Sequence, residues 1–173
     1  GEVSGDAYPD LLIAAPSADP AGDVSGAAYI VFGPPASGSL ADADVKFTGR
    51  TGHNYAGVDI TTGDLNGDGN NDVFIGAIGN DVGGPNSGTI YILYGNVVPG
   101  TIAAATVADY ITGEEDFDEI GTPIRAVDLD GDGVDAAGAL RAASPEALLD
   151  AVRTAQVESG LSTGVIIDGW VIP

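Results

Sequence analysis

The chain has 173 residues, 44% of them hydrophobic, and a formal net charge of −21 that arises from 26 acidic and 5 basic residues. At this length one domain is the default, and the hydrophobic share supports a core, which excludes a globally disordered chain. The negative charge opposes binding to nucleic acid and to anionic membranes. Zero Cys excludes disulfides and thiolate metal sites. No apolar run is long enough for membrane insertion.

The sequence repeats with a nearly constant period. Residues 2–16 overlay residues 64–78, and residues 26–33 overlay residues 88–95, both at an offset of 62. At an offset of 64, residues 46–49 overlay 110–113 and residues 57–64 overlay 121–128. A fixed period of this size predicts a repeat architecture, in which each unit is one supersecondary block.

The first repeat opens on a polar loop with side chains at alternate positions. Positions 1, 3, 5, 7 and 9 of this loop are Glu2, Ser4, Asp6, Tyr8 and Asp10. Ala7 stands where a turn glycine is expected and Ser4 is a weak donor, so we expect weak metal binding or none. The apolar runs at 11–15, 29–32 and 90–94 predict inner strands covered on both faces, and the more polar 44–48 and 108–112 predict outer edges.

The central repeat predicts four strands, at residues 55–62, 72–78, 88–94 and 106–112. Four short strands per unit are typical of a β-propeller blade. The predicted fold is therefore all-β, with about two to two and a half propeller blades over residues 1–136. Because a closed ring needs roughly four to eight blades, we expect further blades in cis or by oligomerisation. The chain opens on Gly1, inside the first motif, which is compatible with a targeting segment upstream.

The loop of the central repeat, residues 64–72, carries the clearest chemical signal. Asp64, Asn66, Asp68 and Asp72 occupy positions 1, 3, 5 and 9, and the backbone carbonyl of Asn70 is available at position 7. Gly69 at position 6 permits the sharp turn that brings these oxygens together. Hard oxygen donors without Cys or His favour Ca²⁺. The alternative is a polar hairpin turn, because turns also use Asp, Asn and Gly.

The flanks of this loop argue against an EF-hand. That motif needs a bidentate Glu at position 12 and helices on both sides. Position 12 is Ile75, within a β-branched and aromatic run that predicts a strand.

The third loop matches the ligand pattern at its first positions and departs from it at position 9. Asp128, Asp130 and Asp132 take positions 1, 3 and 5, and Val134 takes position 7. Position 9 is an alanine, and Asp135 lies one residue early, where strand alternation would turn it away from the ion. The central loop is thus the best predicted site, with a dissociation constant on the order of 10⁻⁴ to 10⁻³ M.

The C-terminal tail, residues 137–173, does not continue the repeat. Ser144 and Pro145 form an N-cap and first-turn pair, and apolar residues on one face predict a helix at about 145–158. A short strand is expected at 165–167. The segment 160–164 satisfies G-x-S-x-G around Ser162, but this motif needs a strand before the serine and a helix after it, the reverse of the order here.

Two further features have simple interpretations. His53 is the only histidine, and one imidazole is poor evidence for catalysis or a metal site. The acidic run at residues 114–119 could hold a second cation or a basic partner, but a solvated connection between blades is favoured.

The loop and the strand after it carry a family resemblance. The segment DLLIAAP at residues 10–16 and the segment at residues 64–77 resemble the FG-GAP repeat of integrin α-subunit β-propellers and their bacterial relatives. The resemblance covers residues 1–136. It implies a structural Ca²⁺ loop between the first two strands of a blade, and a non-enzymatic role in adhesion or ligand binding at the cell surface or outside the cell. It thus implies an extracellular protein or carbohydrate ligand.

The tail resembles, less specifically, a non-catalytic stretch of type-B carboxylesterases, through residues 140–149 and 165–173. Two alternatives to the binding function therefore stay open at this point. The first is a secreted hydrolase that carries the blades as an accessory module. The second is a structural calcium-binding segment without a partner of its own.

Overall fold

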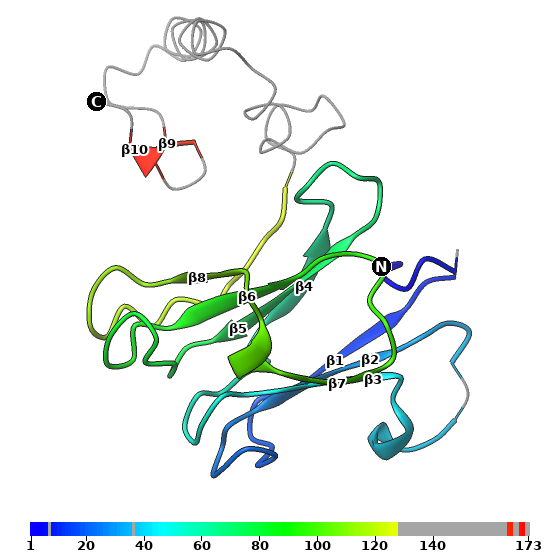
Figure 1. Ribbon diagram of the computed structural model, residues 1–173, viewed down its shortest axis with the longest axis horizontal. Helices are drawn as coiled ribbons and strands as arrows, with labels where there is room; N and C mark the ends of the chain where they lie inside the picture. Colours follow the sequence, from blue (N-terminus) through cyan, green and yellow to red (C-terminus); the bar gives the residue numbers. More distant parts are fainter. Residues whose placement is uncertain (7, 36, 128–165, 168–169, 172–173) are drawn as a thin grey trace, which may run out of the picture. The chain divides into compact units, whose positions relative to one another are not determined.

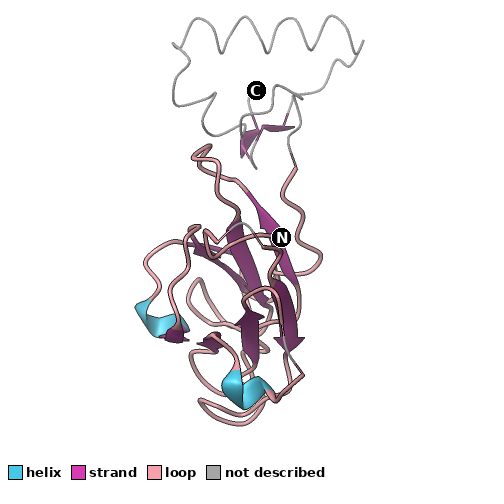
Figure 2. Cartoon of the chain, turned by 90° about the vertical axis from the view of Figure 1, so that its right-hand side faces the viewer, coloured by secondary structure: helices cyan, strands magenta, loops and turns pink. Residues whose placement is uncertain are grey.

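The computed structural model describes residues 1–6, 8–35, 37–127, 166–167 and 170–171 (Figure 1). The chain divides into two compact units, residues 1–64 with 69–126 and residues 65–68 with 127–173. The regular structure of the first unit consists of strands and two short 3-10 helices, Leu40–Asp42 and Ala104–Thr106 (Figure 2). The predicted helix at 145–158 lies outside the described residues.

The first sheet has four strands in the order β1-β2-β3-β7. Strands β1 (Leu11–Ala15), β2 (Ala27–Val31) and β3 (Val45–Thr48) form an antiparallel meander. The fourth strand, β7 (Gly100–Ala103), runs parallel to β3 with Phe47 opposite Ile102.

The second sheet has the order β4-β5-β6-β8 and is antiparallel throughout. Its strands are β4 (Ile60–Gly63), β5 (Asp72–Ala77), β6 (Thr89–Leu93) and β8 (Tyr110–Thr112). The prediction of four strands per unit, with the polar loop between the first two, is confirmed for this sheet. All six residues of β5 are buried, as its apolar run predicts.

Two predicted strands are longer than the observed ones. The strand predicted at 55–62 begins only at Ile60, because residues 55–58 form a turn in which the Val58 N–H donates to the Tyr55 carbonyl at 3.1 Å. Tyr55 and Gly57 have φ values of 54° and 82°, which a strand does not allow. The strand predicted at 106–112 is reduced to β8, because residues 104–106 form a 3-10 helix.

The edges of the first sheet differ from the prediction. Strand β3 is not an outer edge, because β7 from the second repeat pairs with it (Figure 1). Strand β1 is not an inner strand, because it lies at the edge of the sheet, and Leu11 on it is 48% exposed. The prediction of an inner strand covered on both faces is therefore wrong for the run at 11–15.

Backbone contacts repeat with the sequence period. Gly26 and Gly88 have φ values of 79° and 77°, and they bridge Ala56 and Ile120, respectively. A Cβ at either glycine would overlap the backbone of the bridged residue. Glycine at these positions therefore lets the start of β2 or β6 touch the chain that leaves the same repeat.

The two sheets pack face to face around two aromatic rings. The rings of Phe47 and Tyr91 have centroids 5.3 Å apart, and Tyr91 is 1% exposed. The Asn80 amide donates to the Tyr91 hydroxyl at 2.8 Å and to the buried Asn54 at 3.4 Å. Burial raises the pKa of the Tyr91 hydroxyl. This core, drawn from alternate residues of both sheets, makes the first unit one body.

In the second unit, β9 (Ile166–Ile167) pairs antiparallel with β10 (Trp170–Val171). The prediction of a strand at 165–167 is confirmed for Ile166 and Ile167. Within the described part of the chain, no helix has the length and apolar character required to cross a bilayer.

Thr89 offers a direct test of the core. Its hydroxyl is fully buried and has no hydrogen-bond partner among the residues that the structure describes, whereas the equivalent residue of the first repeat is the apolar Ala27. Thr89→Val should therefore raise the free energy of unfolding by about 1 kcal/mol, measured by urea denaturation. The control Thr101→Val, on the exposed start of β7, should change it by less than about 0.5 kcal/mol. A loss of stability in Thr89→Val would show that the hydroxyl has a partner.

Candidate metal loops

The central loop connects β4 to β5 and has the predicted tight turn. Gly69 has a φ of 87°, and Gly67 has a φ of 73°. The Gly69 N–H donates to Asp64 Oδ2 at 2.8 Å. The side chain at position 1 therefore caps the turn glycine at position 6, as a compact loop requires.

Residues 65–68 have contacts of their own. The Asn66 amide donates to Asp68 Oδ2 at 3.0 Å, and the Asp68 N–H donates to Asn66 Oδ1 at 3.0 Å. Asp68 is exposed and Asn66 is half-buried. Within the described residues, no group of three or more His, Cys, Asp or Glu side chains is arranged to hold a metal ion. The predicted ligand set stays a prediction.

The aspartate at position 9 has a structural role that the sequence pattern did not reveal. Asp10 and Asp72 are both buried, although each carries a carboxylate. Asp10 Oδ1 accepts the Gly33 N–H at 3.0 Å, and Asp72 Oδ1 accepts the Gly95 N–H at 2.8 Å. Each carboxylate thus ties the start of one strand to the glycine that follows its hairpin partner.

In the first loop the second oxygen of Asp10 is also engaged. Asp10 Oδ2 accepts the N–H groups of Val3 and Ser4 at 2.7 and 3.0 Å. Three backbone N–H groups therefore satisfy the hydrogen-bonding capacity of this buried side chain. The offset of 62 residues shared by the Asp10–Gly33 and Asp72–Gly95 pairs is the sequence signal that could have indicated this role.

The other side chains of the first loop also bond within the loop. Glu2 Oε1 accepts the Ser4 hydroxyl at 3.3 Å and the N–H of Gly5. Asp6 Oδ1 accepts the Tyr8 N–H at 2.8 Å. The ligand positions predicted in the third loop lie outside the described residues, as does the segment around Ser162.

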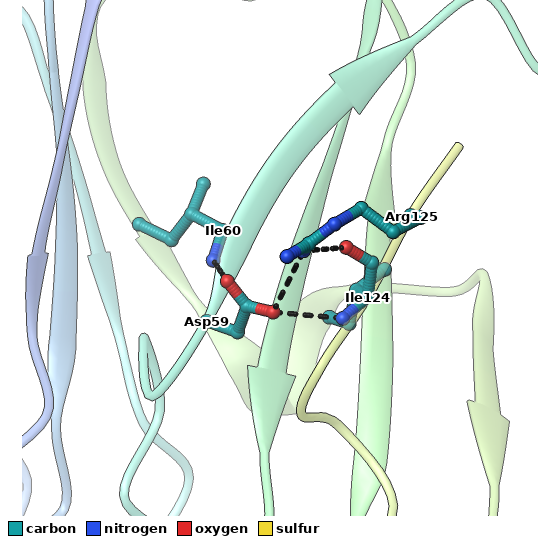
Figure 3. A network of polar contacts seen from close by, with 4 residues as sticks. All are labelled: Asp59, Ile60, Ile124 and Arg125. Carbon is teal, nitrogen blue, oxygen red and sulfur yellow. Dashed lines mark hydrogen bonds and ion pairs between the residues drawn. The ribbon is translucent and has the colours of Figure 1, made fainter. Parts of the chain in front are cut away.

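A further carboxylate, Asp59, was not singled out in the sequence and joins distant parts of the chain (Figure 3). Its Oδ2 accepts the Ile124 N–H at 2.7 Å, and its Oδ1 accepts the Ile60 N–H at 3.0 Å. Arg125 Nη1 lies 3.6 Å from Asp59 Oδ2, with the Arg125 side chain 69% exposed. Asp59 therefore holds residues 124–125 near the start of β4 through the backbone N–H of Ile124 and the exposed ion pair with Arg125.

His53 and the acidic run at residues 114–119 lie on the surface. His53 Nε2 lies 3.6 Å from Asp23 Oδ2, and both side chains are exposed. The acidic residues between 114 and 119 are exposed, and Asp118 Oδ2 accepts the N–H groups of Glu114 and Glu115, each at 2.9 Å. This geometry agrees with the favoured interpretation of that run as a solvated connection.

Two consecutive four-stranded sheets, packed face to face and built on one sequence period, define this part of the chain as β-propeller blades. Residues 56–93 match the family model of the FG-GAP repeat, a non-catalytic propeller module found in extracellular proteins. The match begins in the turn before β4 and ends with β6, so it includes the whole central loop. A comparison with curated proteins finds no significant match.

The role of Asp10 leads to a stability prediction. Asp10→Asn replaces an accepting oxygen with an NH₂ group that would face backbone donors, and it should lower the free energy of unfolding by about 2 kcal/mol. The loss should be equal in Ca²⁺ and in chelator, measured by urea denaturation. The control Asp109→Asn removes the same charge at an exposed site and should have little effect. Destabilisation seen only in Ca²⁺ would instead make Asp10 a metal ligand.

The Asp59 network leads to a second prediction, which separates hydrogen bonds from the ion pair. Asp59→Asn should cost about 1 to 2 kcal/mol, because its oxygens accept two backbone N–H groups. Arg125→Ala should cost less than about 0.5 kcal/mol, since exposed ion pairs contribute little. Thermal unfolding of both variants measures the difference, and equal losses would contradict this division.

Proposed function

We propose that this chain is a calcium-stabilised, non-enzymatic part of a β-propeller that binds an extracellular protein or carbohydrate ligand. The single observation that carries the proposal is the central loop, in which five oxygen donors at alternate positions lie inside the matched FG-GAP repeat. The proposal places the protein outside the cell, where millimolar Ca²⁺ would suit a weak site.

The chemistry of the donor set fits calcium. The side chains of Asp64, Asn66, Asp68 and Asp72 and the carbonyl of Asn70 offer only hard oxygen atoms, which Ca²⁺ prefers. Gly69 has the positive φ that the turn of such a loop requires. The hydrogen bond from Asn66 to Asp68 uses an oxygen for which a bound cation would compete.

Calcium would supply a fixed positive charge between carboxylates that otherwise repel one another. Asp72 is already tied to Gly95 and lies at the first residue of β5, so the loop ends on a buried strand. Ordering this loop would therefore stabilise the connection between the first two strands of the blade. We accordingly assign the ion a structural role and leave ligand recognition to the loops between strands.

The test is a calcium titration by calorimetry, together with thermal unfolding in Ca²⁺ and in chelator. We expect roughly one to two sites. With a dissociation constant on the order of 10⁻⁴ to 10⁻³ M, about 10 mM Ca²⁺ should add about 1.4 to 2.7 kcal/mol to the free energy of unfolding. Asp68→Ala should abolish this gain, and the exposed control Asp109→Ala should keep it. No binding heat and no stabilisation would overturn the metal assignment.

Binding of a protein or carbohydrate ligand must be measured separately from calcium binding. The chain in Ca²⁺ should capture extracellular matrix or cell-surface proteins in a pull-down, or bind defined glycans on an array. Asp68→Ala should weaken that capture in proportion to its loss of folded protein. If the chain binds calcium but captures no protein or glycan, the structural role of calcium would stand and the role in adhesion would be excluded.

A further inference from the structure

A polar hollow lies between one loop of the first repeat and one loop of the second. Residues 50–54 belong to the connection from β3 to β4, and residues 80–82 belong to the connection from β5 to β6. The hollow has a volume of about 330 Å³, which is within the range of small-molecule sites. We call it the inter-repeat hollow, and it is lined by Arg50, Thr51, Asn54, Asn80, Asp81 and Val82.

The walls of the inter-repeat hollow are held in place by hydrogen bonds between the two loops. The Asn80 amide donates to Asn54 Oδ1 at 3.4 Å, and the Asn54 amide donates to the Gly79 carbonyl at 3.3 Å. Asn54 and Asn80 are 2% and 1% exposed. Asn54 Oδ1 also accepts the Thr51 N–H, and Asn80 Oδ1 accepts the Val82 N–H, each at 2.9 Å. The walls are therefore ordered before a ligand binds, which lowers the entropic cost of binding.

Arg50 brings a positive charge to this hollow that no residue of the described part of the chain pairs with. Its side chain is exposed, and the ion pairs in that part involve His53 and Arg125 instead. Burial raises the pKa of the Tyr91 hydroxyl, and the charge of Arg50 lowers it in part. Because the Asn80 amide binds that hydroxyl, the guanidinium lies close enough to act on the buried network behind the hollow.

The second repeat shows which of these side chains the fold requires. At the offset of 64, Asn54 corresponds to Asp118, and each accepts the backbone N–H of the residue three positions earlier at 2.9 Å. The side-chain oxygen at this position is therefore part of the fold. Arg50 corresponds to Glu114, which has the opposite charge. Since the fold tolerates either charge there, the guanidinium of Arg50 is available for recognition.

The lining of the hollow matches a ligand that carries a carboxylate next to hydroxyl groups. A guanidinium binds a carboxylate through two parallel N–H groups. The Asp81 carboxylate is exposed and accepts one backbone N–H at 2.7 Å through Oδ1, which leaves Oδ2 to accept from a ligand hydroxyl. The Thr51 hydroxyl adds a second acceptor, and Val82 adds a small apolar surface for C–H groups.

The charges around the hollow limit the ligand to a single carboxylate. Arg50 is the one base among the described residues that line it, Asp81 is an acid, and the chain as a whole carries −21. A ligand with several negative charges would be repelled by this surface. A uronic acid in an otherwise neutral carbohydrate has one carboxylate and several hydroxyl groups, whereas an acidic peptide segment or a sulfated polysaccharide adds further negative charge.

We propose that the inter-repeat hollow binds a uronic acid residue of a carbohydrate, which rests on the proposed function and names the class of its ligand. Arg50 binds the carboxylate, and Asp81 and Thr51 accept hydrogen bonds from hydroxyl groups of the sugar. The hollow lies beyond the C-terminal end of β5, whereas Asp72, the last residue of the central loop, begins that strand. Calcium and the sugar therefore use different residues of the chain.

The experiment is an NMR titration of the isotopically labelled full chain in Ca²⁺ with methyl β-glucuronide. The backbone amide signals of residues 50–54 and 80–82 should shift, with a dissociation constant on the order of 1 mM, as expected for a ligand of this size. Methyl β-glucoside has a hydroxymethyl group in place of the carboxylate, so it should bind about tenfold more weakly. N-acetylglutamate amide, which mimics an acidic peptide residue, should also bind more weakly. If it binds as tightly as the glucuronide, the assignment of a sugar is overturned.

A pair of variants with the same net charge tests the role of Arg50. Arg50→Gln removes the guanidinium and should raise the dissociation constant for methyl β-glucuronide about tenfold. The control Arg125→Gln removes the same charge at an exposed residue outside the hollow and should bind as wild type does. Unchanged binding by Arg50→Gln would overturn the proposal, as would signal shifts that lie outside residues 50–54 and 80–82.

Folding of each variant is checked by circular dichroism and thermal unfolding. If Arg50→Gln does not fold, Arg50→Glu is the second variant, because Glu114 occupies the equivalent position of the second repeat. It should also lose glucuronide binding, whereas its control Arg125→Glu should keep it.

The calcium titration separates failure of this site from failure of the proposed function. If Ca²⁺ stabilises the chain and no glucuronide binds, the uronic acid site is overturned and the structural role of calcium stands. If glucuronide binds and Ca²⁺ does not stabilise the chain, the metal assignment is overturned and the uronic acid site stands.

Discussion

The contact between Phe47 and Tyr91 is the point on which the described fold depends. It joins one face of the first sheet to one face of the second, and it buries a hydroxyl that only the Asn80 amide satisfies among the described residues. Each sheet alone would leave an apolar face in water. The two repeats are therefore stable as a pair, although the period of the sequence divides them.

The first and the central polar loop each lead into a strand of one of these two sheets. Asp10 and Asp72 are buried carboxylates at the start of a strand, and each binds the backbone of a glycine after the next strand. The last residue of each loop is thus held in place by hydrogen bonds within the chain, which do not require a cation. The residue at position 9 therefore has an anchoring role in addition to the donor role that the proposed function gives it in the central loop.

Much of the fold could be predicted from residues 64–78, because a turn glycine and an apolar run specify loop and strand locally. The turn at residues 55–58 could not, since it depends on positive φ at Tyr55, which the residue type disfavours. Strand β7 escaped prediction because its four residues, GTIA, gain their pairing from β3, far away in sequence. For the candidate site, oxygen donors were visible in the sequence, but the hydrogen bonds of Asp10 and Asp59 depend on partners that only the tertiary structure brings near.

The parallel pairing of β7 with β3 has a consequence for how such a chain could be divided. Strand β7 belongs by sequence to the connection between β6 and β8, yet it completes the sheet of the preceding repeat. The segment that is duplicated in the sequence is therefore not the segment that folds as a unit. A cut at the sequence period would separate the first sheet from one of its own strands, so recombination that preserves folding must exchange these repeats together.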